Sequence, residues 1–489
     1  MRWHSILLTV LILTTAGCSR KTFLRPPDIS VPAADRWTAA DPLPGEVRGQ
    51  WWITFSDKGL NAVIEEALVR NYDLRAAAAR IAAATAQARI AGAALRPQVS
   101  ASLSRARQKQ NFIGFPIPGA EDRVLTTTFT NAGASLDISW EADLWGRIRA
   151  GKFAAVADLE ASREDLRGTK LSIAAQTAKA WFAATETHQQ VALAEATVEN
   201  YRKNVASVRA RYERGLAPSL DLRLAQSDLL RAQALREERK AQGDRSVRQL
   251  EILLGRYPKG NLIEGGTLPQ LPEPIPAGLP ADLVNRRPDL VAAERRLLAA
   301  SARAREAKGS LYPSFTLTTS GSYVSNKLSD ILRGDFQAWS LIGGLLQRIY
   351  EGGRLRATVK LNLARSEEAE AVFAQAVLNA YREVETALAA EQIIERRLHD
   401  LEASVEQALA ARKLAEDRYR GGLVDIITVL SSQRSALDAE NSLLAVRRQL
   451  LDNRVDLHLA LGGGFENASG SRNGPNPNVS DSAKETNPS

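Results

Sequence analysis

Apolar and polar residues alternate along four short stretches of this chain. In the first stretch, Val99, Ala101 and Leu103 are separated by serines. The four stretches are 99–104, 132–140, 315–319 and 339–349. A period of two residues is typical of a β-strand with one apolar face. The pattern therefore predicts four strands in the chain.

Long stretches without proline accompany the predicted strands. Residues 60–95 form an alanine-rich helix that ends before Pro97, and the stretch 151–212 has only Gly168 in its interior as a helix-weakening residue. The second of these helices would extend on the order of 90 Å. Apolar residues recur at heptad spacing in it and in a later stretch: Val198, Tyr201, Val205, Val208 and Tyr212, then Leu398, Leu401, Val405, Ala408, Ala415 and Tyr419. Seams of this length require neighbouring helices of equal length, so they predict a coiled-coil assembly.

The two halves of the chain repeat each other. The segment 211–216 matches 418–423 at an offset of 207 residues, whereas Leu95-Arg96-Pro97 matches Leu311-Tyr312-Pro313 at an offset of 216. The difference of nine residues predicts an insertion in the first copy, for which 112–119 is the candidate. Each copy then contains a helix, two strands, a very long helix and a returning helix.

These observations divide the chain into six segments. They are a signal peptide (1–17), a lipidated N-terminal extension (18–59), a first repeat (60–255), a connector rich in proline and glycine (256–280), a second repeat (281–464) and a tail (465–489). The tail is too polar to pack into a core, and we expect it to be disordered.

Cys18 is the only cysteine and stands at the end of the signal peptide. Arg2 precedes an apolar run, 6–13, that is too short to span a membrane, and small residues lead to Cys18. This arrangement resembles the lipobox of bacterial lipoproteins, although Thr15 stands where leucine is usual. We expect Cys18 to carry the lipid, with a cleaved signal and an incidental cysteine as the alternative. Ser19 after the cysteine favours sorting to the outer membrane.

Composition and charge exclude several other classes of function. The net charge is +8, but basic and acidic residues are interspersed and no basic cluster contains aromatic residues, so nucleic-acid binding is not predicted. His188, His399 and His458 are isolated on predicted helices, and no glycine-rich phosphate-binding loop is present. We therefore predict neither an enzyme nor a bound metal or cofactor.

Four strands are too few to form a closed wall in a lipid bilayer. An open sheet edge is not tolerated there, and no long apolar stretch follows the signal, so any membrane crossing would be by strands. Two chains would supply eight strands, the smallest closed barrel, whose interior side chains fill. Three chains would supply twelve strands and an open lumen, together with twelve long helices around it. We predict the trimer.

Several motifs resemble the TolC/OprM/NodT family of outer membrane factors, in particular its lipoprotein branch. They include an N-terminal pattern, a junction at 143–147 (Asp-Leu-Trp-Gly-Arg), the segment 286–290 (Arg-Arg-Pro-Asp-Leu) and the two Arg-Tyr-x-x-Gly helix ends. The N-terminal pattern comprises Trp51, Trp52, Phe55, Asp57, Leu60, Leu68, Asn71, Asp73 and Leu74. The resemblance covers nearly the whole chain after Cys18. It implies an α+β membrane protein: a homotrimer with a twelve-stranded β-barrel, a long α-helical barrel and a small mixed equatorial region.

The resemblance also implies a gate where the helix ends converge. By position, Tyr419 is the tip tyrosine, Ile427 the apolar constriction residue and Asp425 a source of three carboxylates in the trimer. Asp425 could instead only cap its helix, and Tyr419 could only pack. Ser431 replaces the aspartate of many relatives and Val424 the arginine of one branch, so we do not expect a charged latch at these two positions.

Adaptor docking is implied beside the same helix ends. The residues concerned are Gly215, Leu216 and Ala217 in the first copy and Gly422, Leu423 and Val424 in the second. These residues could alternatively do no more than turn the chain.

The function that follows is that of an outer-membrane channel-tunnel in a tripartite efflux system. It would export drugs, solvents or metal ions delivered by an inner-membrane pump, of the RND type, through a periplasmic adaptor. The alternatives are the outer-membrane duct of a type I protein secretion system, and a structural lipoprotein without a pore. The sequence identifies neither the substrates nor the partners.

Overall fold

The fold is described here from a computed structural model of the chain. The structure describes residues 34, 36–39, 49–112, 124–261, 266–278, 280–327 and 333–463. The predicted signal peptide, Cys18 and the predicted tail from 465 onward lie outside these residues. Among the described helices, none is both long enough and apolar enough to cross a membrane.

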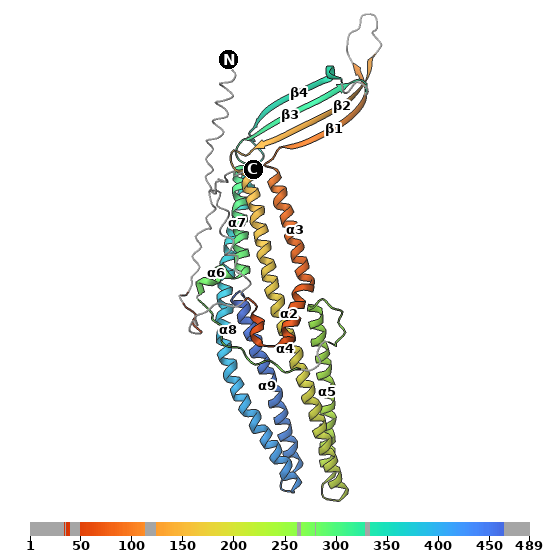
Figure 1. Cartoon of the computed structure of the whole chain (residues 1–489), viewed down its shortest axis with the longest axis vertical. Helices are drawn as coiled ribbons and strands as arrows, with labels where there is room; N and C mark the ends of the chain where they lie inside the picture. Colours follow the sequence, from red (N-terminus) through yellow and green to blue (C-terminus); the bar gives the residue numbers. More distant parts are fainter. Residues whose placement is uncertain are drawn as a thin grey trace, which may run out of the picture. The chain divides into compact units, whose positions relative to one another are not determined.

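The chain forms two compact units. One contains Ala86–Asp158 and Glu294–Ala371, and the other contains the remaining described residues. The first unit holds an antiparallel sheet in the order β1 (Gln98–Phe112), β2 (Leu125–Ala142), β3 (Ser314–Ser325) and β4 (Gln337–Leu346) (Figure 1). The pairing is continuous, for example Val99 with Ile138, Ile138 with Thr319 and Thr319 with Leu341. The four predicted strands are therefore confirmed, although β4 ends before Ile349, which is exposed.

The helices show the internal duplication directly. Corresponding helices of the two copies have equal lengths of 22, 67 and 35 residues. The pairs are α3 (Tyr72–Ala93) with α7 (Pro288–Gly309), α4 (Arg147–Glu213) with α8 (Arg354–Arg420), and α5 (Ser219–Leu253) with α9 (Ile426–Ala460). The strands of the first copy are longer, 15 and 18 residues against 12 and 10, in agreement with an insertion there.

The predicted single helix over 60–95 is wrong, because it is broken into α2 (Lys58–Arg70) and α3. Asn71 between them has an extended backbone, with ψ of 134°. Its side-chain oxygen accepts hydrogen bonds from the amides of Asp73 and Leu74, and its Nδ2 donates to the Leu253 carbonyl at 2.9 Å. A buried asparagine thus ends one helix and starts the next. In the second copy the short α6 (Leu283–Arg286) is followed by its C-cap residue, Arg287, and then by Pro288.

The largest buried cluster of the second unit is built from the motif near residue 50. A 3-10 helix, η1 (Trp51–Phe55), places Trp51, Trp52 and Phe55 against α2, α4 and α9. Asp57 then caps α2 and accepts a hydrogen bond from Trp181 Nε1 at 2.9 Å. The tryptophan motif therefore supplies packing between the two copies.

His458 of α9 belongs to this buried region. Its side chain is 4% exposed and stacks on Trp51, with ring centroids 5.1 Å apart. Neither ring nitrogen has a hydrogen-bond partner within the described chain. Burial, together with the nearby positive charge of Arg454, lowers the pKa of His458 to about 3.

The stability of the protein is expected to depend on pH through His458. The pKa in the folded state lies below the unfolded value of about 6.5, so protonation favours unfolding. This contribution is complete above about pH 6.5 and is lost progressively as the pH falls toward 3. The part already lost at pH 5 is about 2 kcal/mol. Thermal unfolding at pH 7.5 and pH 5 should show a smaller loss of stability in His458→Gln than in the wild type. The exposed His399→Gln is the matched control, and equal losses in all three proteins would refute the role of His458.

Candidate functional site

Both long helices end in the same tight turn. Gly215 and Gly422 have φ of +74° and +76°, the left-handed conformation that closes a helix. The amide of Leu216 donates to the Arg211 carbonyl at 2.8 Å, and the amide of Leu423 donates to the Arg418 carbonyl at 2.9 Å. The turns join α4 to α5, here called hairpin 1, and α8 to α9, here called hairpin 2 (Figure 1).

The residues predicted to dock the adaptor lie at these two turns. Leu216 and Leu423 have 63% and 77% of their surface exposed. Ala217 and Val424 are partly buried. Val424 packs against a buried apolar cluster that includes Val208 of hairpin 1 and Ile426 of hairpin 2. The turn conformation and the exposed leucines occur together, so each turn presents an apolar side chain to its surroundings.

The four predicted gate residues have different environments. Tyr419 is buried, and burial raises the pKa of its hydroxyl. Ile427 and Ser431 are exposed on α9. Asp425 caps α9 by accepting hydrogen bonds from the amide and the hydroxyl of Thr428 at 2.9 and 2.7 Å, which lower its pKa. Asp425 therefore caps α9, and its carboxylate is also exposed and ionised at neutral pH. Its role in a gate stays a prediction.

Hairpin 1 and hairpin 2 are joined by three groups of polar contacts, here called the tip contacts. In the first, Arg211 of α4 donates to the Tyr419 carbonyl at 3.1 Å, and its guanidinium lies 5.0 Å from the centre of the Tyr419 ring. In the second, Asn204 donates to Gln433 and Gln433 donates to Glu416, both at 2.8 Å.

The third tip contact is the ion pair between Asp228 of α5 and Arg434 of α9. Both carboxylate oxygens of Asp228 accept from Arg434, at 2.8 and 2.6 Å. The side chain of Asp228 is only 4% exposed, whereas that of Arg434 is 51% exposed. Tyr201 lies beside this pair, and its pKa is raised by burial and by the Asp228 charge.

The charged tip contacts were not predicted from the sequence, and a signal for them was available. Asp228 stands between Ala225 and Ala232 in a buried stripe at helical spacing, so a carboxylate occupies an apolar position. Gln433 interrupts the buried stripe of α9 in the same way, between Val429 and Ala436.

Tyr212 was assigned to the heptad seam of α4, but its side chain is 44% exposed. The reason is that α4 ends at Glu213 and its last turn lies beyond the buried cluster.

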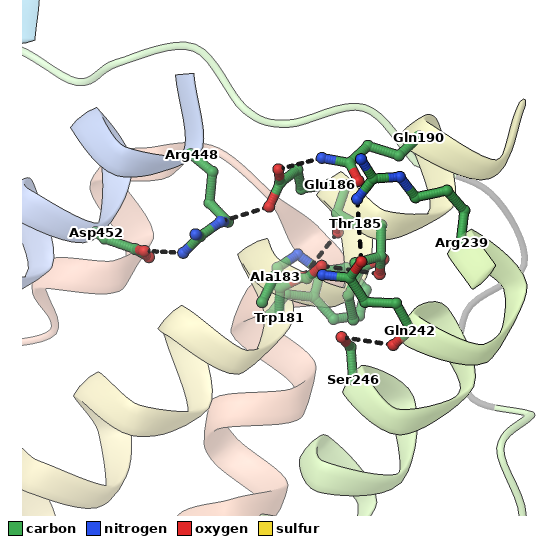
Figure 2. Close-up of polar contacts among 12 residues, drawn as sticks. Trp181, Ala183, Thr185, Glu186, Gln190, Arg239, Gln242, Ser246, Arg448 and Asp452 are labelled. Carbon is green, nitrogen blue, oxygen red and sulfur yellow. Dashed lines mark hydrogen bonds and ion pairs between the residues drawn. The ribbon is translucent and has the colours of Figure 1, made fainter. Parts of the chain in front are cut away.

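Further along the same two hairpins, α4 and α9 are joined by a second polar cluster (Figure 2). Arg448 donates to Glu186 at 2.5 Å and is paired with Asp452, and Gln190 donates to the other Glu186 oxygen at 2.6 Å. Burial raises the pKa of Asp452 to about 6. We call this cluster the root contacts. An arginine held by two carboxylates fixes α4 against α9 at this level.

The fold and the hairpin geometry define a class of protein in which one chain supplies a four-stranded sheet and two long helical hairpins by internal duplication. The family described as Outer membrane efflux protein matches residues 63–256 and 279–463 of the chain. The chain belongs to this family.

Curated relatives and a solved structure agree with this assignment. The chain is 32% identical over 465 residues to the pyoverdine export outer membrane protein OpmQ of Pseudomonas putida, covering 94% of this chain and 97% of that protein. It is 30% identical over 421 residues to the toluene efflux pump outer membrane protein TtgF of Pseudomonas putida, covering 86% of each. The structure of the outer-membrane channel OprN matches with a TM-score of 0.83 at 28% identity, covering 90% of this chain and 98% of that chain.

Family membership confirms several expectations from the sequence. The protein is an outer-membrane efflux channel and not an enzyme. The predicted fold class, with four strands per chain, long helices and duplicated halves, is also confirmed.

Proposed function

We propose that three copies of this chain form one duct that passes small molecules out of the cell. The observation that carries this proposal is the sheet, whose two faces differ in polarity and are both open to the surroundings. Exposed Leu103, Trp339 and Leu341 lie on one face. Asp137, Ser102 and Ser135 lie on the other, where the Ser135 hydroxyl donates to Asp137 at 2.7 Å. An apolar outer face and a polar inner face are what a wall between lipid and a water-filled lumen needs.

The edges of the sheet support the number of chains. β1 and β4 each pair on one side only, and unpaired strand edges are costly in lipid. Pairing β1 of one chain with β4 of the next would remove both edges, and three chains would give twelve strands around an open lumen. The lipid on Cys18 would anchor the same assembly to the outer membrane.

The helices would continue the duct into the periplasm and provide its gate. In this arrangement the tip contacts hold hairpin 2 against hairpin 1 in the closed state, while the root contacts remain fixed. Opening would separate Arg434 from Asp228 and Arg211 from Tyr419. Three copies of Asp425 and Ile427 would surround the narrow end, so that the mouth favours cations.

The partners and cargo follow from the family context. OpmQ and TtgF are named for export of pyoverdine and for toluene efflux, both small molecules. We propose that this chain also serves a tripartite efflux pump, with a periplasmic adaptor docking on exposed Leu216 and Leu423 and an inner-membrane pump of the RND type supplying the energy.

The proposal is tested by conductance in planar bilayers. Detergent-purified trimers of the full chain should insert and produce discrete current steps of one size. The steps should be small in the wild type, because the tip contacts hold the narrow end of the duct closed, and larger in Asp228→Asn. The same preparation dissociated by heat serves as the control. A deletion strain should also become several-fold more susceptible to some antibiotics, dyes or solvents. Trimers that insert without any current steps would contradict the duct.

A further inference from the structure

The apolar face of the sheet changes character along its length. Because the pairing is continuous, alternate residues of each strand can be assigned to this face without ambiguity. The rows nearest the helices contain mostly large apolar side chains: Val99, Leu103, Leu136, Ile138, Trp140, Phe315, Leu317, Trp339, Leu341 and Leu345. The rows beyond Leu103 contain only small or polar residues and three basic ones.

The three basic residues are Arg105, Arg107 and Lys109 of β1. They are separated from Val99 and Leu103 by an even number of positions in β1, so their side chains lie on the same face of the sheet. All three are exposed. Their partners on β2 are Ala132, Thr130 and Thr128. In the described strands no carboxylate lies on this face, because Asp137 and Glu141 belong to the opposite one. Three positive charges therefore stand together on a face that carries no acidic residue within the described strands.

Their level along the sheet can be estimated from the strand geometry. Trp140 lies at the end of β2 that leads into α4, and Ala132, the partner of Arg105, is eight residues away along β2. With strands tilted by about 40°, this places Arg105 about 20 Å above Trp140 along the membrane normal, and Lys109 about 30 Å above it. The apolar band of an outer-membrane barrel is about 25 Å tall. The basic residues thus lie at its far edge, on the side away from the helices.

We propose that Arg105, Arg107 and Lys109 bind the phosphate groups of glycolipids in the outer leaflet of the outer membrane. This inference rests on the proposed function, since it requires the sheet to be part of a membrane-spanning wall. Alternate residues of a strand are about 7 Å apart, so the three side chains can contact separate oxygens of one phosphorylated headgroup. Arginine and lysine are the usual ligands of phosphate, and Thr128 and Thr130 offer hydroxyl donors beside them. With three subunits, the channel would carry three such sites.

An ion pair within the assembly is the competing role for these residues. Asp335 is exposed in the turn that precedes β4, at the edge that would meet β1 of a neighbouring subunit. If the basic residues served this ion pair, their loss would weaken the trimer in the absence of any lipid. The two roles therefore predict different results in lipid-free detergent.

The test compares the wild type with a variant in which all three residues are glutamine. Purified full-chain trimers in detergent are titrated with lipid A bearing two phosphates and with its dephosphorylated form, and binding is counted by native mass spectrometry. The variant should bind the phosphorylated form at least about tenfold more weakly, and the difference should shrink at high salt. Both proteins should bind the dephosphorylated form alike.

Two further variants control for charge and for folding. The substitutions R105K, R107K and K109R keep the charges and should keep the binding. Removing three exposed basic residues from hairpin 1 should leave binding unchanged (K203Q, R209Q and R223Q).

Failure of this inference can be separated from failure of the duct. If the wild type and the glutamine variant both conduct in planar bilayers but bind both lipids equally, the phosphate site is refuted and the duct stands. If the glutamine variant and Asp335→Asn both lose the trimer in lipid-free detergent, the ion pair replaces the phosphate site. If the wild type does not conduct, both proposals fall.

Discussion

Replacing Asp228 with asparagine is expected to raise the conductance of the channel several-fold. The substitution keeps the size of the side chain but removes the charge that holds Arg434 of hairpin 2. Hydrogen bonds to a charged group contribute about 1.5–3 kcal/mol and exposed ion pairs about 0.2–1 kcal/mol, so we take about 1 kcal/mol for the pair with the half-exposed Arg434. A coupling of about 1 kcal/mol shifts a two-state equilibrium by about fivefold. Single-channel recording, and the susceptibility of cells to large antibiotics that enter through an open duct, would measure the effect.

Two further variants test whether the effect is specific to the Asp228–Arg434 ion pair. Asp417→Asn removes an exposed carboxylate on α8 that pairs with Arg420 of its own helix, and it should leave the conductance unchanged. Arg434→Gln removes the other member of the same ion pair and should raise the conductance as Asp228→Asn does. A closed channel in Asp228→Asn would show that this contact does not hold the gate.

Replacing Arg454 with methionine is expected to destabilise the protein by about 3–5 kcal/mol, because the arginine is one half of a buried ion pair. Its side chain is 1% exposed, is paired with Glu391 of α8 and donates to the Glu273 carbonyl at 2.7 Å. Methionine fills much of the volume but leaves the Glu391 carboxylate, 13% exposed, without its partner. Thermal or denaturant unfolding of the purified protein would show the change.

The origin of that loss is tested by removing both charges. The double variant Arg454→Met with Glu391→Leu should be more stable than Arg454→Met alone, since no buried charge then lacks a partner. Arg447→Met provides the matched control: its partner Glu402 and Arg447 itself are each 47% exposed, so the cost should stay below about 1 kcal/mol. If Arg454→Met and Arg447→Met cost the same, the burial of the ion pair has no energetic consequence.

Much of the architecture could be predicted because it depends on local and periodic signals. The alternation in 99–104 and 132–140 identified β1 and β2, since strand faces follow a period of two. The heptad seams identified α4 and α8, and the repeated Arg-Tyr-x-x-Gly ends placed both turns, since only glycine readily adopts the left-handed conformation there. The wrong prediction of one helix over 60–95 had a non-local cause. Asn71 breaks a helix through a hydrogen bond to Leu253, a residue 182 positions later in the chain.

The sequence by itself therefore determined the four strands, the duplicated hairpins and the outer-membrane efflux family of this protein, because each rests on periodicity or on a short motif. Only the tertiary structure decided which charges meet. Asp228 and Arg434 are 206 residues apart, and Arg448 and Glu186 are 262 apart. No spacing rule links such residues, since their contact depends on how one helix packs against another. The structure also extends β1 beyond the predicted 99–104 to Phe112, and this extension places Arg105, Arg107 and Lys109 on the face that bears Val99 and Leu103.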